Sequence, residues 1–398
     1  MKKTDAFVLL YRTKLANSNY LKAELIKWKN KKVIYLDYTA NTPVDKEVLN
    51  KFVETESKFF GNPNSNHQEG KKAKEELAKI TENIANLLNI EPSEIIYTSG
   101  ASEANNLAIK GITDISQGKH IITTKLEHSS VWVPVEELKK RGFTVDYAPL
   151  KDDGKIDISQ LIKSIKPDTA LISICLVDGE LGIIQPINKI AEEIKKISDC
   201  KIHIDGTQAL GKIKIDFKNI DTMSFSAHKI YGLNGSGILF KRGHLKLAPQ
   251  ISGGISSSLY RSGTPTLALN SAFYVAIKKA IENQEKRFSD ILKKNQNLRE
   301  FFKQFPKVKI NSPQNAVPHI INLSVEGIKG NVFQRKIDSY GICVSVKSAC
   351  SSDGLPSRAV TALGNSERTA LSSWRISLSH LTTLKEIEQF KEIFAKLV

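Results

Sequence analysis

The sequence predicts an α/β fold, with a mainly parallel sheet in a large domain and a smaller α+β domain after it. From Val33 onward, short β-branched runs alternate with amphipathic stretches, which is the pattern of βαβ units around a parallel sheet. After about Arg261 this alternation gives way to a long helical region that ends near Phe305. The chain has 398 residues, which is enough for two domains.

The alternating region begins with a helix followed by a strand. Apolar residues recur at helical spacing between Ala73 and Leu87, and the strand-like run 95–97 follows a break at Pro92. The further predicted strands are residues 120–124, 144–148, 170–175, 201–204, 223–226 and 237–240. After the long helical region we expect strands at 319–325 and 342–346 and a closing helix from Leu384.

The change of pattern divides the chain into three predicted parts. A basic, partly helical extension covers residues 1–30, a large domain covers 31–260 and a smaller domain covers 261–398. The extension contains no recognisable motif.

The composition is that of an ordinary globular protein. It is 40% hydrophobic and 25% charged, which excludes disordered and fibrous classes. No apolar run is long enough to span a membrane, and the first apolar stretch is too short for a signal peptide. We therefore expect a cytoplasmic protein with no membrane association. The spacing of Cys175, Cys200, Cys343 and Cys350 matches neither CxxC pairs nor zinc sites, so we expect reduced thiols and no metal.

The net charge of +16 raises the possibility of a nucleic-acid partner. Residues 1–32 carry eight Lys and one Arg against Asp5 and Glu24, a surplus of seven, whereas the remaining surplus is mixed with acidic residues. We favour a solvated lysine-rich surface without direct nucleic-acid binding. An acidic or RNA partner of the extension stays an alternative.

A lysine at the end of a predicted strand is the sharpest chemical signal. Lys229 closes the segment Ser226-Ala227-His228-Lys229, and Asp205 ends another strand 24 positions earlier. Pyridoxal phosphate (PLP) needs a lysine amine to hold it, donors for its phosphate and a carboxylate that keeps its pyridine nitrogen protonated. Each feature alone is weak evidence, because a strand-end Asp is more often a helix cap. Together they indicate a PLP site.

Two further segments supply suitable groups. In the run 98–103, Thr-Ser-Gly-Ala-Ser-Glu, a strand meets a helix, so backbone N–H groups and the Ser102 hydroxyl can hold a phosphate. An ordinary helix cap would have the same sequence. His128 follows another strand, where an imidazole can lie over a flat cofactor and move protons. A lone histidine is, however, more often structural.

In order and spacing, these segments resemble the cysteine desulfurases of the class V aminotransferase group, PLP enzymes of the aspartate-aminotransferase fold. The resemblance covers the chain from about residue 33 to the C-terminus. It rests on YLDYTANTP from Tyr35, GNPNS from Gly61, and the TSGASE, EH, DGTQA and SAHK segments from Thr98, Glu127, Asp205 and Ser226.

The resemblance implies a role for each matching residue. Lys229 would form the Schiff base with PLP, Asp205 would pair with the pyridine nitrogen, Gln208 would hydrogen-bond the ring oxygen and His128 would stack on the ring. The residues that it assigns to the phosphate are Ala101, Ser102, Ser226 and His228. Thr264 is similar to the family's threonine that contacts the phosphate of a neighbouring subunit, so the resemblance implies a homodimer.

The expected reaction type depends on Cys350. It lies in the small, polar segment 347–354, which suits an exposed thiol, and a desulfurase needs a thiolate that attacks the substrate's sulfur. Its position matches the persulfide cysteine of the family. Cys175 and Cys343 lie in apolar strands and are predicted to be core residues.

Arg375 is the expected substrate-binding residue. The run 372–378 is similar to the substrate-binding strand of the family, and a guanidinium suits a bidentate contact with a carboxylate. Asn41, in the opening segment, is the second expected substrate contact.

The chain departs from the family pattern at Asp178-Gly179, where the family usually has Asn-Asn. The first of these positions normally contacts the cofactor, so Asp178 is expected there. An aspartate would repel the ring oxygen or retain its own proton. Leu233-Asn234 also replaces the common Pro-Lys after the lysine.

The resemblance therefore implies a cysteine desulfurase that converts L-cysteine to L-alanine, with a persulfide on Cys350. The persulfide would supply an acceptor such as an iron–sulfur scaffold or a tRNA-thiolation enzyme. Three alternatives stay open: a selenocysteine lyase or another class V PLP enzyme, a weakened paralogue that acts as a binding partner, and a basic nucleic-acid-binding protein.

Overall fold

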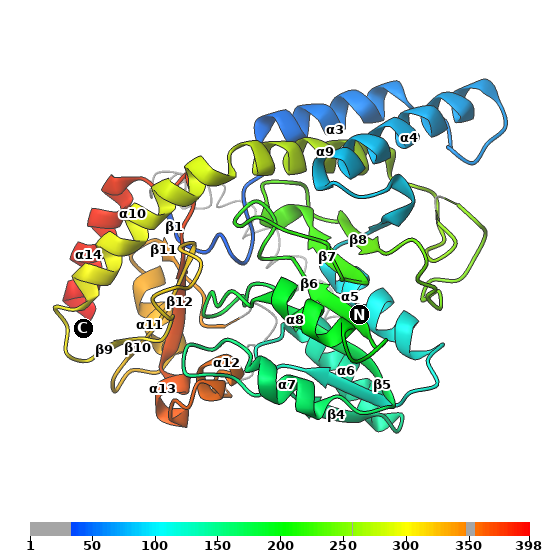
Figure 1. Cartoon of the computed structure of the whole chain (residues 1–398). Coiled ribbons are helices and arrows are strands. Elements are labelled where there is room, and N and C mark those ends of the chain that lie inside the picture. Colours follow the sequence, from blue (N-terminus) through cyan, green and yellow to red (C-terminus); the bar gives the residue numbers. More distant parts are fainter. Residues whose placement is uncertain (1–32, 257, 348–354) are drawn as a thin grey trace, which may run out of the picture.

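The computed structural model describes residues 33–256, 258–347 and 355–398. A seven-stranded sheet forms the centre of the large part of the molecule (Figure 1). The spatial order is β2-β8-β7-β6-β5-β3-β4, in which β4, β3, β5, β6 and β7 pair in parallel and β8 is antiparallel to both of its neighbours. The strands are β2 (Ile95–Thr98), β3 (His120–Thr123), β4 (Thr144–Tyr147), β5 (Thr169–Cys175), β6 (Lys201–Asp205), β7 (Thr222–Ser226) and β8 (Gly237–Lys241). The predicted α/β fold is confirmed.

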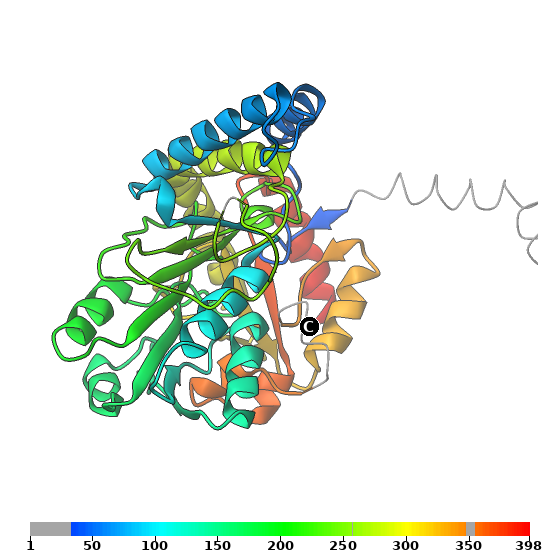
Figure 2. The ribbon, with the colours of Figure 1, turned by 90° about the vertical axis from the view of Figure 1, so that its right-hand side faces the viewer.

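Helices cover both faces of this sheet, as Figure 2 shows from the side. Neighbouring residues of one strand point to opposite faces. Ile121 packs in a cluster with α5 (Ala101–Thr113) and α6 (Ser129–Lys140), and Ile122 packs in the cluster on the other face. The helices of that second cluster are α3 (Lys46–Lys58), α4 (Gln68–Leu88), α7 (Ile158–Ser164), α8 (Ile187–Lys195) and α9 (Leu267–Glu282). Burial on both faces explains why these strands read as continuous apolar runs.

The smaller part of the molecule contains an antiparallel sheet of order β12-β10-β9 and a parallel pair of β1 with β11. The strands are β1 (Ile34–Tyr35), β9 (Val308–Ile310), β10 (Ile320–Val325), β11 (Ile342–Cys343) and β12 (Ser373–Ser377). The helices are α10 (Gln284–Phe302), α11 (Gly330–Asp338), α12 (Arg358–Ala362), α13 (Glu367–Leu371) and α14 (Leu384–Leu397). Aromatic rings fill its core, where Phe333 stacks on Trp374 with ring centroids 4.5 Å apart.

The residues that form each hydrophobic core do not follow the boundaries of the predicted domains. Leu267 and Phe273 of α9 pack in the core of the large part, although they lie beyond residue 260. Ile34 and Leu36 pack in the core of the small part, because β1 pairs with β11 (Figure 2). The predicted long helical region is two helices, α9 and α10, with Asn283 between them. The predicted extension, residues 1–30, lies outside the described residues.

Two findings concern membrane association and metal binding. In the part of the chain that the structure describes, no helix is long and apolar enough to cross a membrane. Across the same residues, no group of three or more His, Cys, Asp or Glu side chains is placed to hold a metal ion.

Candidate active site

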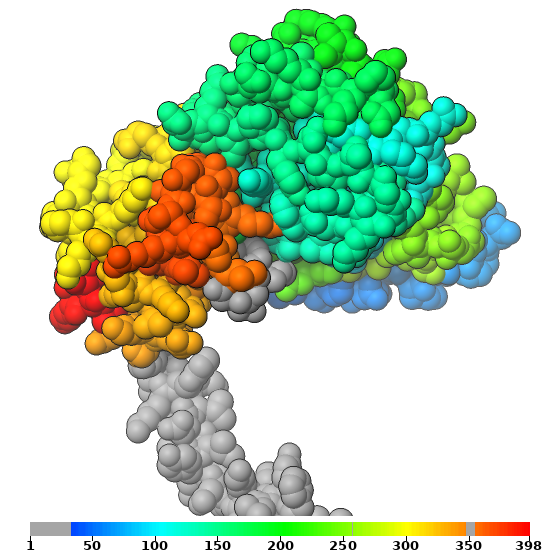
Figure 3. Space-filling view, turned by 90° about the horizontal axis from the view of Figure 1, so that it is seen from below, coloured from blue at the N-terminus to red at the C-terminus, as the bar shows by residue number. Residues whose placement is uncertain are grey.

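A cavity of about 410 Å³ opens where the carboxyl ends of β5, β6 and β7 meet the first turns of α5 and α6. Figure 3 shows the orange segment around α12 and α13 packed against the large part, and Arg358 and Arg375 bring the small part into the cavity wall. Nine of the predicted site residues line the cavity: Ala101, Ser102, His128, Asp178, Asp205, Gln208, His228, Lys229 and Arg375.

Lys229 lies in the short turn Ala227–Lys229 that directly follows β7. Its Nζ donates hydrogen bonds to Thr39 O at 2.8 Å and to Ala40 O at 2.7 Å. Gln208 Nε2 donates to the same Thr39 O at 3.1 Å. The loop after β1 therefore holds the amine and the amide side by side at the cavity wall.

Asp205 is the last residue of β6 and is buried. Its Oδ2 accepts a hydrogen bond from Asn105 Nδ2 at 2.9 Å, and its Oδ1 accepts one from the backbone N–H of Thr207 at 2.9 Å. Asn105 is fixed in turn by His203, whose Nε2 lies 3.0 Å from Asn105 Oδ1. These contacts orient the carboxylate, and Asn105 is a positioning residue that sequence reasoning missed. The sequence offered one signal for Asn105: it is a polar side chain on a helix face that is otherwise apolar.

His128 is the N-cap of α6, and its Nδ1 accepts a hydrogen bond from the backbone N–H of Ser130 at 3.1 Å. In the neutral ring the proton is therefore on Nε2. Desolvation lowers the pKa of His128, and the charges of Lys229 and Arg358 lower it further. The ring is accordingly a neutral proton acceptor or donor at the cavity wall. Stacking on a cofactor stays a prediction.

The first turn of α5 meets β8 and the turn after β7 in a tight cradle. A Cβ built on Gly237 would lie 2.5 Å from Gly100 Cα, so position 237 has no room for a side chain, and Gly100 has φ 153°, a backbone angle that favours glycine. Ser226 Oγ lies 2.8 Å from His228 Nδ1 and would be 3.5 Å from a Cβ on Gly100. Ser226 thus lies beside this cradle, although it does not line the cavity. The backbone N–H groups of a helix N-terminus and a hydroxyl are good phosphate donors.

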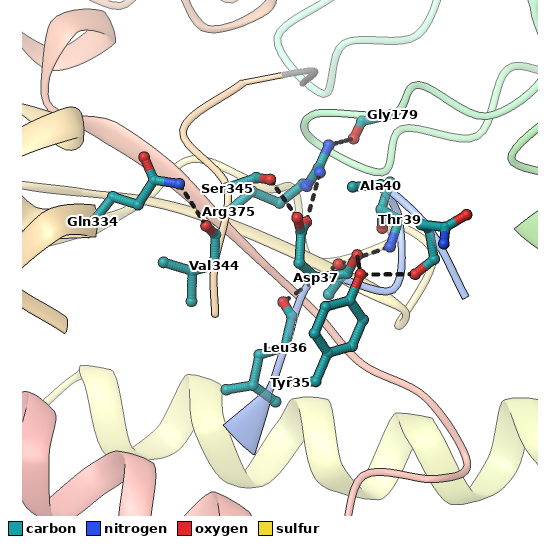
Figure 4. A network of polar contacts seen from close by, with 12 residues as sticks. Tyr35, Leu36, Asp37, Thr39, Ala40, Gly179, Gln334, Val344, Ser345 and Arg375 are labelled. Atoms are coloured by element: carbon teal, nitrogen blue, oxygen red, sulfur yellow. Dashed lines mark hydrogen bonds and ion pairs between the residues drawn. The ribbon is translucent and has the colours of Figure 1, made fainter. Parts of the chain in front are cut away.

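The guanidinium of Arg375 is held from two sides (Figure 4). Nη1 donates to Gly179 O at 2.7 Å, and Nη2 forms an ion pair with Asp37 Oδ1 at 3.0 Å. Asp37 Oδ2 accepts from Ser345 Oγ at 2.7 Å. Arg375 Nε is buried and has no hydrogen-bond partner among the described residues. Since buried donors are normally paired, this N–H has capacity for a ligand carboxylate.

Comparison with known proteins identifies the family. A family model described as aminotransferase class-V matches residues 34–390. The chain belongs to the class-V aminotransferase family. A cysteine desulfurase IscS from Dictyoglomus turgidum is 35% identical over 375 residues, which cover 92% of this chain and 95% of the relative. A cysteine desulfurase IscS from Buchnera aphidicola is 40% identical over 369 residues, which cover 89% and 90%.

Solved structures agree with this family. A NifS-like protein has a TM-score of 0.86 at 31% identity, covering 92% of this chain and 99% of the other. The NifS-like protein from Rickettsia africae has a TM-score of 0.82 at 29% identity, with coverage of 92% and 99%. Class-V aminotransferases are PLP enzymes, and so is this chain.

The cavity of this class-V aminotransferase fits PLP in three respects. An amine, Lys229, and a buried carboxylate, Asp205, line the same cavity. The cradle at Gly100 supplies donors for a phosphate. Thr207 lines the cavity, and its buried hydroxyl has no hydrogen-bond partner within the described ranges, so it too has capacity for a ligand.

Asp178 lines the cavity, yet its carboxylate binds its own turn. Oδ1 accepts from the N–H of Glu180 at 3.1 Å, and Oδ2 accepts from the N–H groups of Leu181 at 2.5 Å and Gly182 at 3.2 Å. Burial, together with the nearby Glu180, raises the pKa of Asp178 to about 7. The raised pKa agrees with the expectation that an aspartate here tends to retain a proton.

Cys350 lies outside the described residues. Three other predicted site residues are described but do not line the cavity. Ser226 has been placed beside the phosphate cradle. Asn41 is exposed, and its backbone oxygen accepts from Tyr35 Oη at 2.9 Å. Thr264 is also exposed, with Oγ1 3.5 Å from Asn62 Nδ2. Their substrate and cofactor contacts stay predictions.

Of the two cysteines that were predicted to be core residues, Cys175 is confirmed, because it packs in a buried apolar cluster, whereas Cys343 is not. Cys343 is only partly buried, because β11 lies at the edge beside β1. Cys175 is buried, but it lines the active-site cavity. Burial and the neighbouring Glu127 raise the pKa of Cys175, which keeps its thiol protonated.

Sequence reasoning also missed Glu127 and Arg358, which line the cavity. Glu127 Oε1 accepts from Thr124 Oγ1 at 2.7 Å and from the N–H of Cys175 at 3.0 Å, while Oε2 is buried and no described residue hydrogen-bonds to it. Burial raises the pKa of Glu127 to about 8. The Arg358 guanidinium lies 3.9 Å from the centre of the Trp132 ring and donates to Glu127 O at 3.1 Å. Two sequence signals could have indicated these residues: Glu127 is adjacent to His128, and Arg358 lies in a small polar segment.

Proposed function

We propose that this class-V aminotransferase is a cysteine desulfurase, which converts L-cysteine to L-alanine and forms a persulfide on Cys350. The observation that carries the proposal is the single cavity that brings together Lys229, Asp205 and Arg375. Relatives named cysteine desulfurase, at 35% and 40% identity over most of the chain, support the choice of substrate.

Arg375 binds the carboxylate of the substrate. Asp37 and Gly179 O hold the guanidinium in place, and the unpaired Nε–H is available to the carboxylate. A carboxylate fixed at this point places the Cα–H bond in a constant orientation within the cavity. Arg375 is 2% exposed, so the contact forms away from bulk water.

Bound PLP supplies an electron sink for the charge that develops on the substrate Cα. Asp205 pairs with its pyridine nitrogen and the Gly100 cradle holds its phosphate. The amine of Lys229 accepts the Cα proton, or the neutral ring of His128 does so. The thiolate of Cys350 then attacks the substrate sulfur. The C–S bond breaks, the new S–S bond forms, and the carbon that loses sulfur takes up a proton and leaves as alanine.

A homodimer is part of the proposal. Leu49, Val53 and Phe60, on or next to α3, are exposed apolar residues, as are Ile255 and Leu259 in the segment before Thr264. Exposed apolar side chains of this kind favour a protein–protein contact. In a dimer with this contact, Thr264 of one subunit would complete the phosphate site of the other. Light scattering on the purified protein tests the dimer: a monomeric mass would contradict it.

Cytoplasmic location and transfer of the persulfide to an iron–sulfur scaffold or a tRNA-thiolation enzyme belong to the same proposal. They rest on the relatives named IscS and on the sequence resemblance.

The decisive experiment measures sulfide and alanine released from L-cysteine in the presence of a reductant, for the PLP-loaded wild type and for Cys350→Ser. We expect equal amounts of both products from the wild type and loss of both in the variant. A yellow, PLP-loaded wild type that releases neither product would reject the desulfurase and favour selenocysteine or another amino acid as substrate.

A further inference from the structure

A second, smaller cavity adjoins the active site, since Thr39 and Lys229 line both. Its volume is about 20 Å³, which is room for a particle of about the size of one water molecule. The basic residues that line it are Lys212, Lys229, Arg287, His319 and His380, and no described Asp or Glu lines it. The feature that needs explanation is a small cavity whose basic lining residues have no acidic residue beside them among the described lining residues.

These groups come from distant parts of the chain. Lys212 lies in the turn after β6, Arg287 on α10, His319 just before β10 and His380 just after β12. Gly211 has φ 72°, and a Cβ there would lie 2.7 Å from Ala280 Cβ, so this turn approaches α9 too closely for any side chain. The packing of both parts of the molecule builds the cavity.

The donors around this cavity have few acceptors. Lys212 is 8% exposed, and its Nζ donates to Gln208 Oε1. Nδ1 of His319, a residue that is 7% exposed, and Nδ1 of His380 are buried, and neither has a hydrogen-bond partner in the part of the chain that the structure describes. Among the described residues, no carboxylate forms an ion pair with Lys212 or Arg287. Buried cationic groups are normally paired with opposite charge.

We propose that this cavity binds one small monovalent anion of halide size, with chloride as its occupant. Every basic group in the wall can act as a donor, and a halide accepts hydrogen bonds from several donors and carries the opposite charge, whereas a water molecule accepts at most two and is neutral. A larger anion such as phosphate exceeds the volume. The proposal for this anion site holds whichever substrate the enzyme uses.

The anion acts on the active site through Lys212 and Gln208. Protonated Lys212 is a donor only, so Gln208 must turn its Oε1 toward Lys212. Gln208 Nε2 then donates to Thr39 O at 3.1 Å, and the same oxygen accepts from Lys229 Nζ at 2.8 Å. An anion that stabilises the charge of Lys212 therefore holds Gln208 in the orientation that the cofactor site needs.

The affinity for the anion depends on pH. Burial and the charges of Lys229 and Arg375 lower the pKa of Lys212 to about 7. Burial, Lys212, His380 and Arg287 lower the pKa of His319, and burial with Arg287 and Lys294 lowers that of His380 to about 4, against the opposing charges of Asp290 and Asp45. Tyr38 and Tyr231 also line the cavity and have raised pKa values. Lys212 is thus the group that loses its charge near neutrality, and chloride binds more weakly as the pH rises through about 7.

Crystals of the PLP-loaded enzyme soaked in bromide test the site directly. We expect an anomalous difference peak between Lys212, Arg287 and His319. Bromide peaks confined to the protein surface, with only water density in the cavity, would overturn the proposal.

Thermal unfolding of the PLP-loaded enzyme gives an independent test. Chloride and gluconate are compared at equal ionic strength, at pH 6 and at pH 8.5. We expect a saturable rise of the midpoint with chloride alone, larger at pH 6. Equal midpoints in the two salts at both pH values would contradict an anion site, whatever the substrate of the enzyme proves to be.

Two matched pairs of variants test whether the chloride effect on the unfolding midpoint arises at this cavity. Arg287→Met should lose the chloride effect, whereas Arg299→Met should keep it, because Arg299 is also half-buried on α10 but donates to Ser312 O and Pro313 O. Lys212→Met should lose both the chloride effect and its pH dependence. Lys241→Met should retain them, since buried Lys241 donates to three backbone carbonyls away from the cavity. A chloride effect that survives in Arg287→Met and Lys212→Met would reject this cavity as the site.

Discussion

Asp37 Oδ1 accepts a hydrogen bond from Arg375 Nη2 at 3.0 Å, and this contact joins two segments 338 residues apart (Figure 4). Asp37 follows β1 and Arg375 lies in the middle of β12. Asp37 also accepts from Ser345, so a single carboxylate links the opening segment, the proposed substrate arginine and the segment that follows β11.

Replacing Asp37 with Asn should weaken substrate binding. The substitution keeps an oxygen for Arg375 but removes the charge that fixes the guanidinium. We expect kcat/KM for L-cysteine to fall about tenfold or more, mainly through KM, and the free energy of unfolding to fall by about 3 kcal/mol. Steady-state kinetics and urea unfolding measure both quantities. Ser345→Ala, which removes only the hydrogen bond to the other oxygen, should have a smaller effect, and an equal effect would contradict the role of the charge.

Lys229→Ala should abolish the visible absorption of bound PLP, near about 420 nm, because the conjugated bond to the amine is lost. Asp205→Asn should retain a yellow protein with much slower turnover, since the amide cannot stabilise a protonated pyridine nitrogen. Spectra and single-turnover kinetics distinguish the two variants. A yellow Lys229→Ala protein would show that another amine holds the cofactor.

A side chain at Gly237 should disrupt the phosphate cradle. The added Cβ of Gly237→Ala would lie 2.5 Å from Gly100 Cα, and this backbone atom cannot move without shifting the first turn of α5. We expect the affinity for PLP to fall about tenfold or more, measured by titration of the cofactor-free protein. Gly243→Ala is the control, because its Cβ would have only Glu94 Oε1 within 4 Å, at 3.9 Å. Equal affinity in both variants would argue against the cradle.

Glu127→Gln should change how stability depends on pH. The pKa of Glu127 is raised to about 8 in the folded protein, above its value in the unfolded chain, so the folded state binds more protons between the two values. The wild type therefore loses stability as the pH rises from about 4.5 to about 8, and the neutral amide removes this loss.

Urea unfolding of the PLP-loaded protein between pH 5 and pH 9 measures this difference. The stability of Glu127→Gln relative to the wild type should increase with pH and level off above about 8. Glu137→Gln is the control: the contact with Lys110 lowers the pKa of Glu137, so this carboxyl titrates below the measured range and its variant should show no trend between pH 5 and pH 9. A pH-independent difference for Glu127→Gln would show that the carboxyl is ionised throughout.

The sequence alone predicted the α/β class and most of the strands of the central sheet. It also predicted those residues of the cavity wall that lie at strand ends. Local patterns carry this information: strands buried on both faces are continuously apolar, and Lys229 and Asp205 directly follow such runs. The order of the short segments identified the family, which the comparisons confirmed.

Only the tertiary structure decided which distant segments meet. No local pattern pairs β1 with β11, places α9 in the core of the large part or brings Asp37 to Arg375, because these contacts depend on the packing of elements far apart in the chain. The same holds for Lys212, whose sequence context is that of an ordinary surface lysine. Its burial beside Lys229, Arg287 and two histidines arises from the meeting of both parts of the molecule, and that burial lowers its pKa to about 7.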